Sequence, residues 1–125
     1  MRGKETILVV DDDADVADVL VTALGRLGYT VLATNDPLRA LAAFEQDPSA
    51  WHAVISDEMM PMMRGHEMLK RMKKIRPSVK TILCSGSRDV LTSEPAIRTA
   101  ADQTYVKPID VREIAFVLRI LFDRR

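Results

Sequence analysis

Short apolar runs alternate with amphipathic segments along the whole chain, and this alternation predicts repeated strand–helix units. The first run, Ile7-Leu8-Val9-Val10, has no polar position, which is typical of a strand buried on both faces of a parallel sheet. The predicted strands lie at residues 7–10, 29–34, 52–56, 79–84 and 104–106. The order indicates an α/β fold in which helices cover both faces of one parallel sheet.

The segments between the strands carry apolar residues at helical spacing and recognisable helix ends. Asp36-Pro37 provides an N-cap followed by proline at the first helical position, and Gly28 is a typical stop signal. The predicted helices run from Asp13 to Gly28, from Asp36 to Pro48, from Gly65 to Pro77 and from Asp110 to about Phe122.

Residues 85–102 do not follow one pattern. Gly86, Ser87 and Pro95 interrupt the segment, and only residues 96–101 have a helical apolar face. The sequence therefore predicts a loop followed by a short helix.

Composition sets bounds on the class of protein. The 125 residues, 47% of them apolar, suffice for one domain spanning residues 1–125 with a full core. Eighteen basic and eighteen acidic residues give no net charge, so no nucleic-acid-binding surface is predicted. A single cysteine, Cys84, excludes an internal disulfide, and no apolar run is long enough to span a membrane. These features predict a cytoplasmic location.

Polar residues follow four of the predicted strands at the point where each strand ends. Asp11 and Asp12 follow the first strand, Asp57 the third, Ser85 the fourth and Lys107 the fifth. The carboxyl ends of parallel strands share one edge of a sheet, so these side chains are expected to converge. Clustered carboxylates need a compensating cation, and oxygen ligands without His or Cys favour Mg²⁺. A metal, an amine and a hydroxyl around Asp57 suit phosphoryl transfer, with Asp57 as the nucleophile.

Each piece taken alone has a simpler explanation. Residues 11–13 resemble a helix N-cap cluster, Lys107-Pro108 a turn, and Ser85-Gly86 a loop. Asp57 alone would cap the segment that follows it. The functional interpretation is favoured because these residues occur together, each after a separate buried strand.

These motifs together resemble the receiver domain of two-component response regulators. Asp11-Asp12 resembles the acidic pair of that family, and Asp57 with Met60-Pro61 its phosphoacceptor motif. Gly65 resembles the glycine before the third helix of the family. Ser85-Gly86 resembles its Ser/Thr-plus-small pair, and Lys107-Pro108 resembles its Lys-Pro pair. The resemblance implies a flavodoxin-like (βα)5 three-layer sandwich with strand order 2-1-3-4-5.

The resemblance also implies roles for the site residues. Asp12, Asp57 and the backbone carbonyl of Met59 would hold Mg²⁺, with Asp11 acting through water. Ser85 and Lys107 would bind the phosphoryl oxygens. The implied partner is a histidine kinase or a histidine phosphotransfer protein, and the chain would be a signalling domain that catalyses only its own phosphotransfer and dephosphorylation.

The chain departs from the family pattern at residues 100–103, where Ala100-Ala101-Asp102-Gln103 replaces the usual Gly-Ala stretch, and at position 104. The family usually has Phe or Tyr three residues before the lysine, as a rotameric switch, and this chain has Thr104 there. Tyr105 should point to the opposite face because side chains alternate along a strand. Aromatic switching is therefore in question, whereas the phosphoryl chemistry is not.

Two other functions fit parts of the sequence. An enzyme of the haloacid dehalogenase type also forms an aspartyl phosphate, and residues 11–13 contain its Asp-x-Asp spacing, but the chain is too short for a cap and Asp57 stays unexplained. A receiver that only binds proteins is disfavoured by the intact acidic residues, Ser85 and Lys107. The chain is either a stand-alone regulator or part of a longer one, and residues 82–86 resemble receivers of hybrid kinases.

The last predicted helix is apolar almost all round, although a helix lying on a sheet buries one stripe. The face expected toward the sheet comprises Val111, Ile114, Leu118, Leu121 and Phe122. Phe116, Val117 and Ile120 are then left toward the flank or solvent. They pack on the fourth helix or on a longer native chain, or they form a contact surface. By resemblance, that surface would serve self-association or partner docking through the fourth helix, the fifth strand and the last helix.

The other reactive side chains are expected to be structural. His52 opens a strand and His66 a helix, so both are interpreted as structural or solvent-facing. Cys84 is expected in the core, and the methionines at 59, 60, 62 and 63 are expected to pack around the loop.

Overall fold

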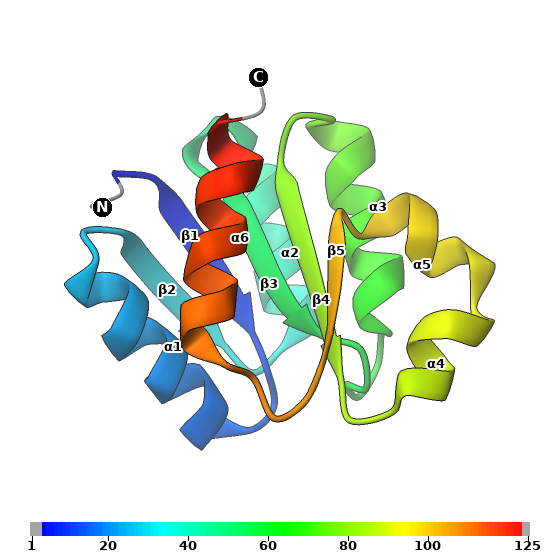
Figure 1. Cartoon of the computed structure of the whole chain (residues 1–125). Coiled ribbons are helices and arrows are strands. Elements are labelled where there is room, and N and C mark those ends of the chain that lie inside the picture. The colour runs from blue at the N-terminus through cyan, green and yellow to red at the C-terminus, as the bar shows by residue number, and fades with distance from the viewer. Residues whose placement is uncertain (1–3, 124–125) are drawn as a thin grey trace.

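A parallel five-stranded sheet in the order β2-β1-β3-β4-β5 forms the centre of this computed structural model (Figure 1). The structure describes residues 4–123, so the first three and last two residues of the predicted domain lie outside it. The strands are β1 Thr6–Val10, β2 Thr30–Thr34, β3 Ala53–Asp57, β4 Lys80–Ser85 and β5 Gln103–Val106. The predicted fold class and strand order are confirmed.

Helices cover both faces of the sheet (Figure 1). On one face lie α1 Ala14–Arg26 and α6 Val111–Asp123, and the other side carries α2 Pro37–Gln46, α3 Gly65–Ile75, α4 Arg88–Ser93 and α5 Pro95–Ala100. A 3-10 turn, Pro48–Ala50, follows α2. Among the described residues, no helix combines the length and apolar character needed to cross a membrane.

Successive side chains of β1 pack into two separate hydrophobic cores, one on each face of the sheet. Leu8 and Val10 pack into the cluster under α2 and α3, whereas Ile7 and Val9 pack into the cluster under α1 and α6. Both faces of this strand are therefore buried, which explains why its sequence is apolar throughout rather than alternating.

The predicted helix ends match the structure. The Asp13 carboxylate accepts hydrogen bonds from the backbone N–H groups of the first turn of α1, and Asp36 does the same for α2. Gly28, with φ of 98°, follows the end of α1 in the left-handed region that favours glycine. Asp110 accepts the backbone N–H of Arg112 at the start of α6.

The segment after β4 differs from the prediction, because the expected loop contains the helix α4. Only Leu91 of its six residues is buried, so the sequence shows no apolar period. The Ser87 hydroxyl instead starts the helix by accepting the Val90 N–H at 3.3 Å. Pro95 is the first residue of α5 and not an interruption, because proline fits the first helical position.

The burial of α6 follows the predicted stripe with two differences. Ile114, Leu118, Leu121 and Phe122 are buried toward the sheet, and Phe116 and Ile120 are exposed. The differences are Val111, which is only partly buried, and Val117, which packs partly against the core.

Gly65 lies where α3 meets the end of β3. A Cβ atom at this position would lie 2.1 Å from the backbone oxygen of Asp57 and 2.8 Å from the Leu83 side chain. Backbone cannot move aside as a flexible side chain can, so only glycine fits.

We predict that Gly65→Ala lowers the free energy of unfolding by about 2 kcal/mol or more, the cost of forcing an atom into packed structure. Urea denaturation measures the change. Gly25→Ala is the matched control, because a Cβ there meets nothing within 4 Å, and alanine should stabilise α1. Equal stability of Gly65→Ala and the wild type would show that the junction of β3 and α3 has room for a side chain.

Candidate functional site

Three aspartates converge where β1 and β3 end. Asp11, Asp12 and Asp57 each offer a carboxylate oxygen, and these oxygen atoms lie within 4.8 Å of one another. Asp11 and Asp57 are 3% and 7% exposed, whereas Asp12 faces solvent. Asp57 is itself the last residue of β3, whereas the prediction placed it just after the strand. The predicted convergence of the three aspartates is thus present in the structure.

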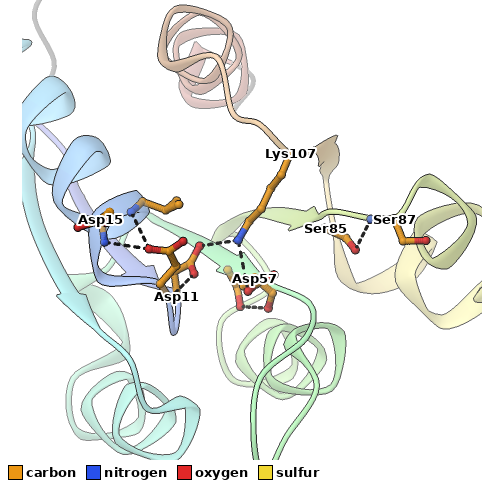
Figure 2. Close-up of polar contacts among 9 residues, drawn as sticks. Asp11, Asp15, Asp57, Ser85, Ser87 and Lys107 are labelled. Carbon is orange, nitrogen blue, oxygen red and sulfur yellow. Dashed lines mark hydrogen bonds and ion pairs between the residues drawn. The ribbon is translucent and has the colours of Figure 1, made fainter.

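Lys107 reaches this cluster from the end of β5. Its ammonium nitrogen donates a hydrogen bond to Asp11 Oδ2 at 3.0 Å and lies 3.3 Å from Asp57 Oδ2 (Figure 2). Its backbone N–H donates to the Ser85 carbonyl at 2.8 Å, which fixes the start of the β5–α6 loop to β4. Because the side chain is only 21% exposed, its charge is poorly screened by solvent.

The cluster contains more carboxylates than ammonium groups, and this excess of negative charge affects the pKa values of Asp57 and Lys107. Burial raises the pKa of Asp57, Lys107 lowers it, and Asp11 raises it further, so the pKa lies above its ordinary value. Burial lowers the pKa of Lys107, but the contacts with Asp11 and Asp57 outweigh burial and raise it overall. One ammonium group beside three carboxylates leaves negative charge that a cation could balance, and carboxylate oxygens are ligands that Mg²⁺ prefers.

Ser85 lies at the end of β4, at the same edge of the sheet. It is buried, and its hydroxyl oxygen accepts the backbone N–H of Ser87 at 3.1 Å (Figure 2). Ser87 in turn caps α4. The structure therefore connects Ser85 to the start of α4, and none of the contacts of its hydroxyl within the described residues is to Asp57 or Lys107.

Met59 lies in the loop between β3 and α3, two residues after Asp57. Its side chain is 49% exposed, and Arg64 Nη1 lies 3.0 Å from its sulfur. The role of its carbonyl as a metal ligand stays a prediction. Of the other loop methionines, Met60 is buried and Met63 packs on the core, whereas Met62 is exposed.

Asp13 does not join the acidic cluster. Its carboxylate accepts the N–H groups of Asp15 and Val16, and its own N–H donates to Asp11 Oδ1 at 2.9 Å. The Asp-x-Asp spacing thus serves to start α1, which argues against the dehalogenase-type alternative.

Thr104 and Tyr105 lie on opposite faces of β5, as predicted. Thr104 pairs in register with Leu83, whose side chain belongs to the core under α3. Tyr105 packs against the core under α6, and its hydroxyl donates to the Glu113 carbonyl at 3.5 Å. Tyr105 therefore does not replace the missing aromatic residue at position 104.

The remaining reactive side chains are structural, as expected. His52 Nδ1 accepts the backbone N–H of Thr6 at 3.0 Å, and Cys84 is buried in the core. Burial raises the pKa of Cys84 to about 12, so it stays a thiol.

One buried polar pair beside the site could not be found from the sequence. Glu58 is 1% exposed, and its carboxylate contacts both the backbone and the ring of His66. The sequence gives no signal that the carboxylate of Glu58, directly after Asp57, contacts α3 instead of the three aspartates. His66 also gave none, because its partner lies eight residues earlier in the chain.

In the absence of Mg²⁺, removing the charge of Asp57 should stabilise the protein. A carboxyl whose pKa is raised on folding costs stability once pH exceeds its unfolded value, and the cost grows until the folded pKa is passed. Asp57→Asn should therefore melt at a higher temperature than the wild type at pH 7, and the difference should shrink toward pH 4. Thermal melts followed by circular dichroism test this, with Asp18→Asn, an exposed position on α1, as control. A lower melting temperature for Asp57→Asn would show that the ionised Asp57 stabilises the fold instead.

Comparisons with known proteins agree with this geometry. The family model of the response regulator receiver domain matches residues 7–119. The transcriptional regulator NtrC of Azospirillum brasilense is 34% identical over 116 residues, which are 90% of this chain and 23% of that protein. The probable transcriptional regulator ycf27 of Guillardia theta is 31% identical over 124 residues, which are 99% of this chain and 48% of that protein. The chain thus spans less than half the length of these two relatives.

Solved structures show the same architecture. The response regulator TrrA of Thermotoga maritima, in complex with Mg²⁺ and BeF, has a TM-score of 0.84 and 27% sequence identity. The match covers 94% of this chain and 98% of that one. Since the family model covers most of the chain, the chain belongs to the response regulator receiver domain family.

Proposed function

We propose that Asp57 accepts a phosphoryl group from a phosphohistidine donor and thereby changes the partner preference of the domain. The observation that carries this proposal is the position of the Asp57 carboxylate, 3.3 Å from the Lys107 ammonium and within 4.8 Å of oxygen atoms of Asp11 and Asp12. One Asp57 oxygen attacks phosphorus while the P–N bond of the donor breaks, and its electron pair returns to the imidazole.

Mg²⁺ would be held by Asp12, Asp57 and the Met59 carbonyl, with Asp11 acting through water. When bound, it neutralises charge on the transferred group and on the aspartates. The TrrA structure, which contains Mg²⁺ and BeF, supports this choice of metal. The hard oxygen donors of the cluster support it independently.

Lys107 and Ser85 would hold the phosphoryl oxygens. The Lys107 ammonium already lies between Asp11 and Asp57, so it needs little movement to contact an oxygen on Asp57. The Ser85 hydroxyl oxygen accepts from Ser87, which leaves its proton for donation to a phosphoryl oxygen. Because Ser87 caps α4, a turn of the Ser85 side chain would be transmitted to that helix.

The donor would be a histidine kinase or a histidine phosphotransfer protein. A groove of about 500 Å³ beside the site supports docking of an apolar helix face there. It is lined by side chains of α1 and of the β5–α6 loop, including Val16, Val19, Lys107 and Ile109. Since Lys107 contacts Asp57, a histidine carried on such a helix would lie close to the nucleophile.

The output surface would include α6 and β5. Phe116 is 68% exposed and borders a groove of about 420 Å³ shared with Tyr105 and Val117. Ile120 is 37% exposed on the same helix. Phe116 and Ile120 are four residues apart and so share one face of α6. Contiguous exposed apolar side chains usually mark a contact surface, so self-association or effector docking is proposed here.

Phosphorylation is tested by incubating the protein with acetyl phosphate and Mg²⁺ and measuring the intact mass. The wild type should gain one phosphoryl group, and either Asp57→Asn or chelation of Mg²⁺ should abolish the gain. Lys107→Ala should keep Mg²⁺ binding but lose most of the adduct, because no fixed cation then holds the phosphoryl oxygens. Asp18→Asn is the control and should be labelled like the wild type. An unlabelled wild type would favour the binding-only alternative.

Self-association is tested by light scattering with and without beryllofluoride. The wild type should double its mass in beryllofluoride, and a variant carrying Phe116→Glu and Ile120→Glu should stay monomeric, because charge on both side chains prevents their burial. Leu38→Glu, a matched change at an exposed leucine on α2, should behave like the wild type. A wild type that is monomeric throughout would refute self-association and leave docking of another protein.

A further inference from the structure

Glu58 follows Asp57 directly, yet its carboxylate is not part of the cluster formed by the three aspartates and Lys107. The side chain is 1% exposed, less than that of Asp57. Glutamate is almost never buried to this degree unless it is paired, because removing a carboxylate from water is costly. The contacts that compensate this burial therefore show what the side chain does.

Both carboxylate oxygens of Glu58 contact His66 at the start of α3. Oε1 accepts the backbone N–H of His66 at 2.8 Å, and Oε2 lies 2.6 Å from Nδ1 of the imidazole. Arg64, the N-cap residue of α3, makes no side-chain capping bond. Glu58 thus caps α3 from the end of the preceding strand, where the helix dipole favours negative charge.

The backbone of Glu58 is held as firmly as its side chain. Its N–H donates to the Cys84 carbonyl at 2.8 Å, and its carbonyl accepts the Gly65 N–H at 3.0 Å. Glu58 therefore closes the loop from residue 58 to residue 65 at both ends. Asp57 stands immediately before this loop, and Met59 is its second residue.

We propose that Glu58 is a positioning residue, whose carboxylate ties the β3–α3 loop to α3 and so directs the Asp57 carboxylate and the Met59 carbonyl toward Mg²⁺. This inference rests on the proposed function, which assigns those two groups to the metal. Glu58 itself touches neither the metal nor the phosphoryl group. It acts by limiting the orientations open to its two neighbours, as hydrogen-bonded partners of metal ligands do.

Isothermal titration of Mg²⁺ into the protein tests the inference. Glu58→Ala should weaken Mg²⁺ binding about tenfold, as loss of a group that orients metal ligands typically does. Glu58→Gln should recover most of the affinity, because its amide oxygen still accepts the His66 N–H. Glu67→Gln is the matched control, since it removes one charge from an exposed side chain near the start of α3 and should change binding little.

His66→Ala is the second variant, in case Glu58→Ala does not fold. It keeps the backbone N–H bond and removes the ring contact, so its loss of affinity should lie between those of Glu58→Gln and Glu58→Ala. Circular dichroism at the titration temperature shows that each variant is folded when binding is measured.

Two results would overturn the inference, and they differ. If folded Glu58→Ala and His66→Ala bind Mg²⁺ like the wild type, the pair only stabilises the fold, and the proposed function is unaffected. If the wild type itself does not bind Mg²⁺, the proposed metal site fails, and the inference fails with it.

Discussion

Two buried carboxylates that share one ammonium group are the constraint on which this domain depends. Asp11 and Asp57 come from different strands, and Lys107 comes from a third, so their contact requires β1, β3 and β5 to end at one edge. Burial raises the pKa of Asp57, and the neighbouring charge of Asp11 raises it further. The folded state therefore keeps a strained charge arrangement that a cation or a charge-neutral substituent would relieve. Stability and function are opposed at Asp57 for this reason.

The sequence predicts most of the fold because its strands include fully apolar runs and most of its helices have a recognisable end. β1 shows this clearly, since its neighbouring residues enter different cores. The convergence of the three aspartates and Lys107 could be predicted because parallel strands place their ends together, a rule that needs no knowledge of side-chain packing. α4 could not be predicted, since it has one buried residue and starts from a side-chain cap. The contact between Glu58 and His66 depends on where the loop returns, which local sequence patterns do not contain.

The net charge of the chain does not reveal its acidic site, because acidic and basic residues are concentrated in different segments. Residues 11–18 contain five aspartates and no basic residue, whereas residues 64–76 contain six lysines and arginines and one glutamate. The acidic segment leads into α1 on one face of the sheet, and the basic segment forms α3 on the other. The edge that carries the three aspartates therefore lies beside a strongly negative segment, which favours the approach of cations. A sum over the whole chain conceals this arrangement.

Because position 104 carries no aromatic residue, a conformational switch in this domain would need another element, and the segment that follows Ser85 is the candidate. A switch needs an element that is held by few contacts, so that a small change at the site alters its free energy appreciably. α4 meets this condition, because Leu91 is its one buried residue and Ser87 caps its first turn. The Ser85 hydroxyl accepts the Ser87 N–H, so reorienting Ser85 toward a phosphoryl oxygen would weaken the contact that precedes the cap. Tyr105 packs on the opposite face of β5, where its hydroxyl donates a hydrogen bond to the Glu113 carbonyl of α6, and it has no contact with Ser85 among those the structure shows for the described residues. If Asp57 is phosphorylated as proposed, the contact between Ser85 and Ser87 offers a route to α4 that needs no aromatic side chain at position 104.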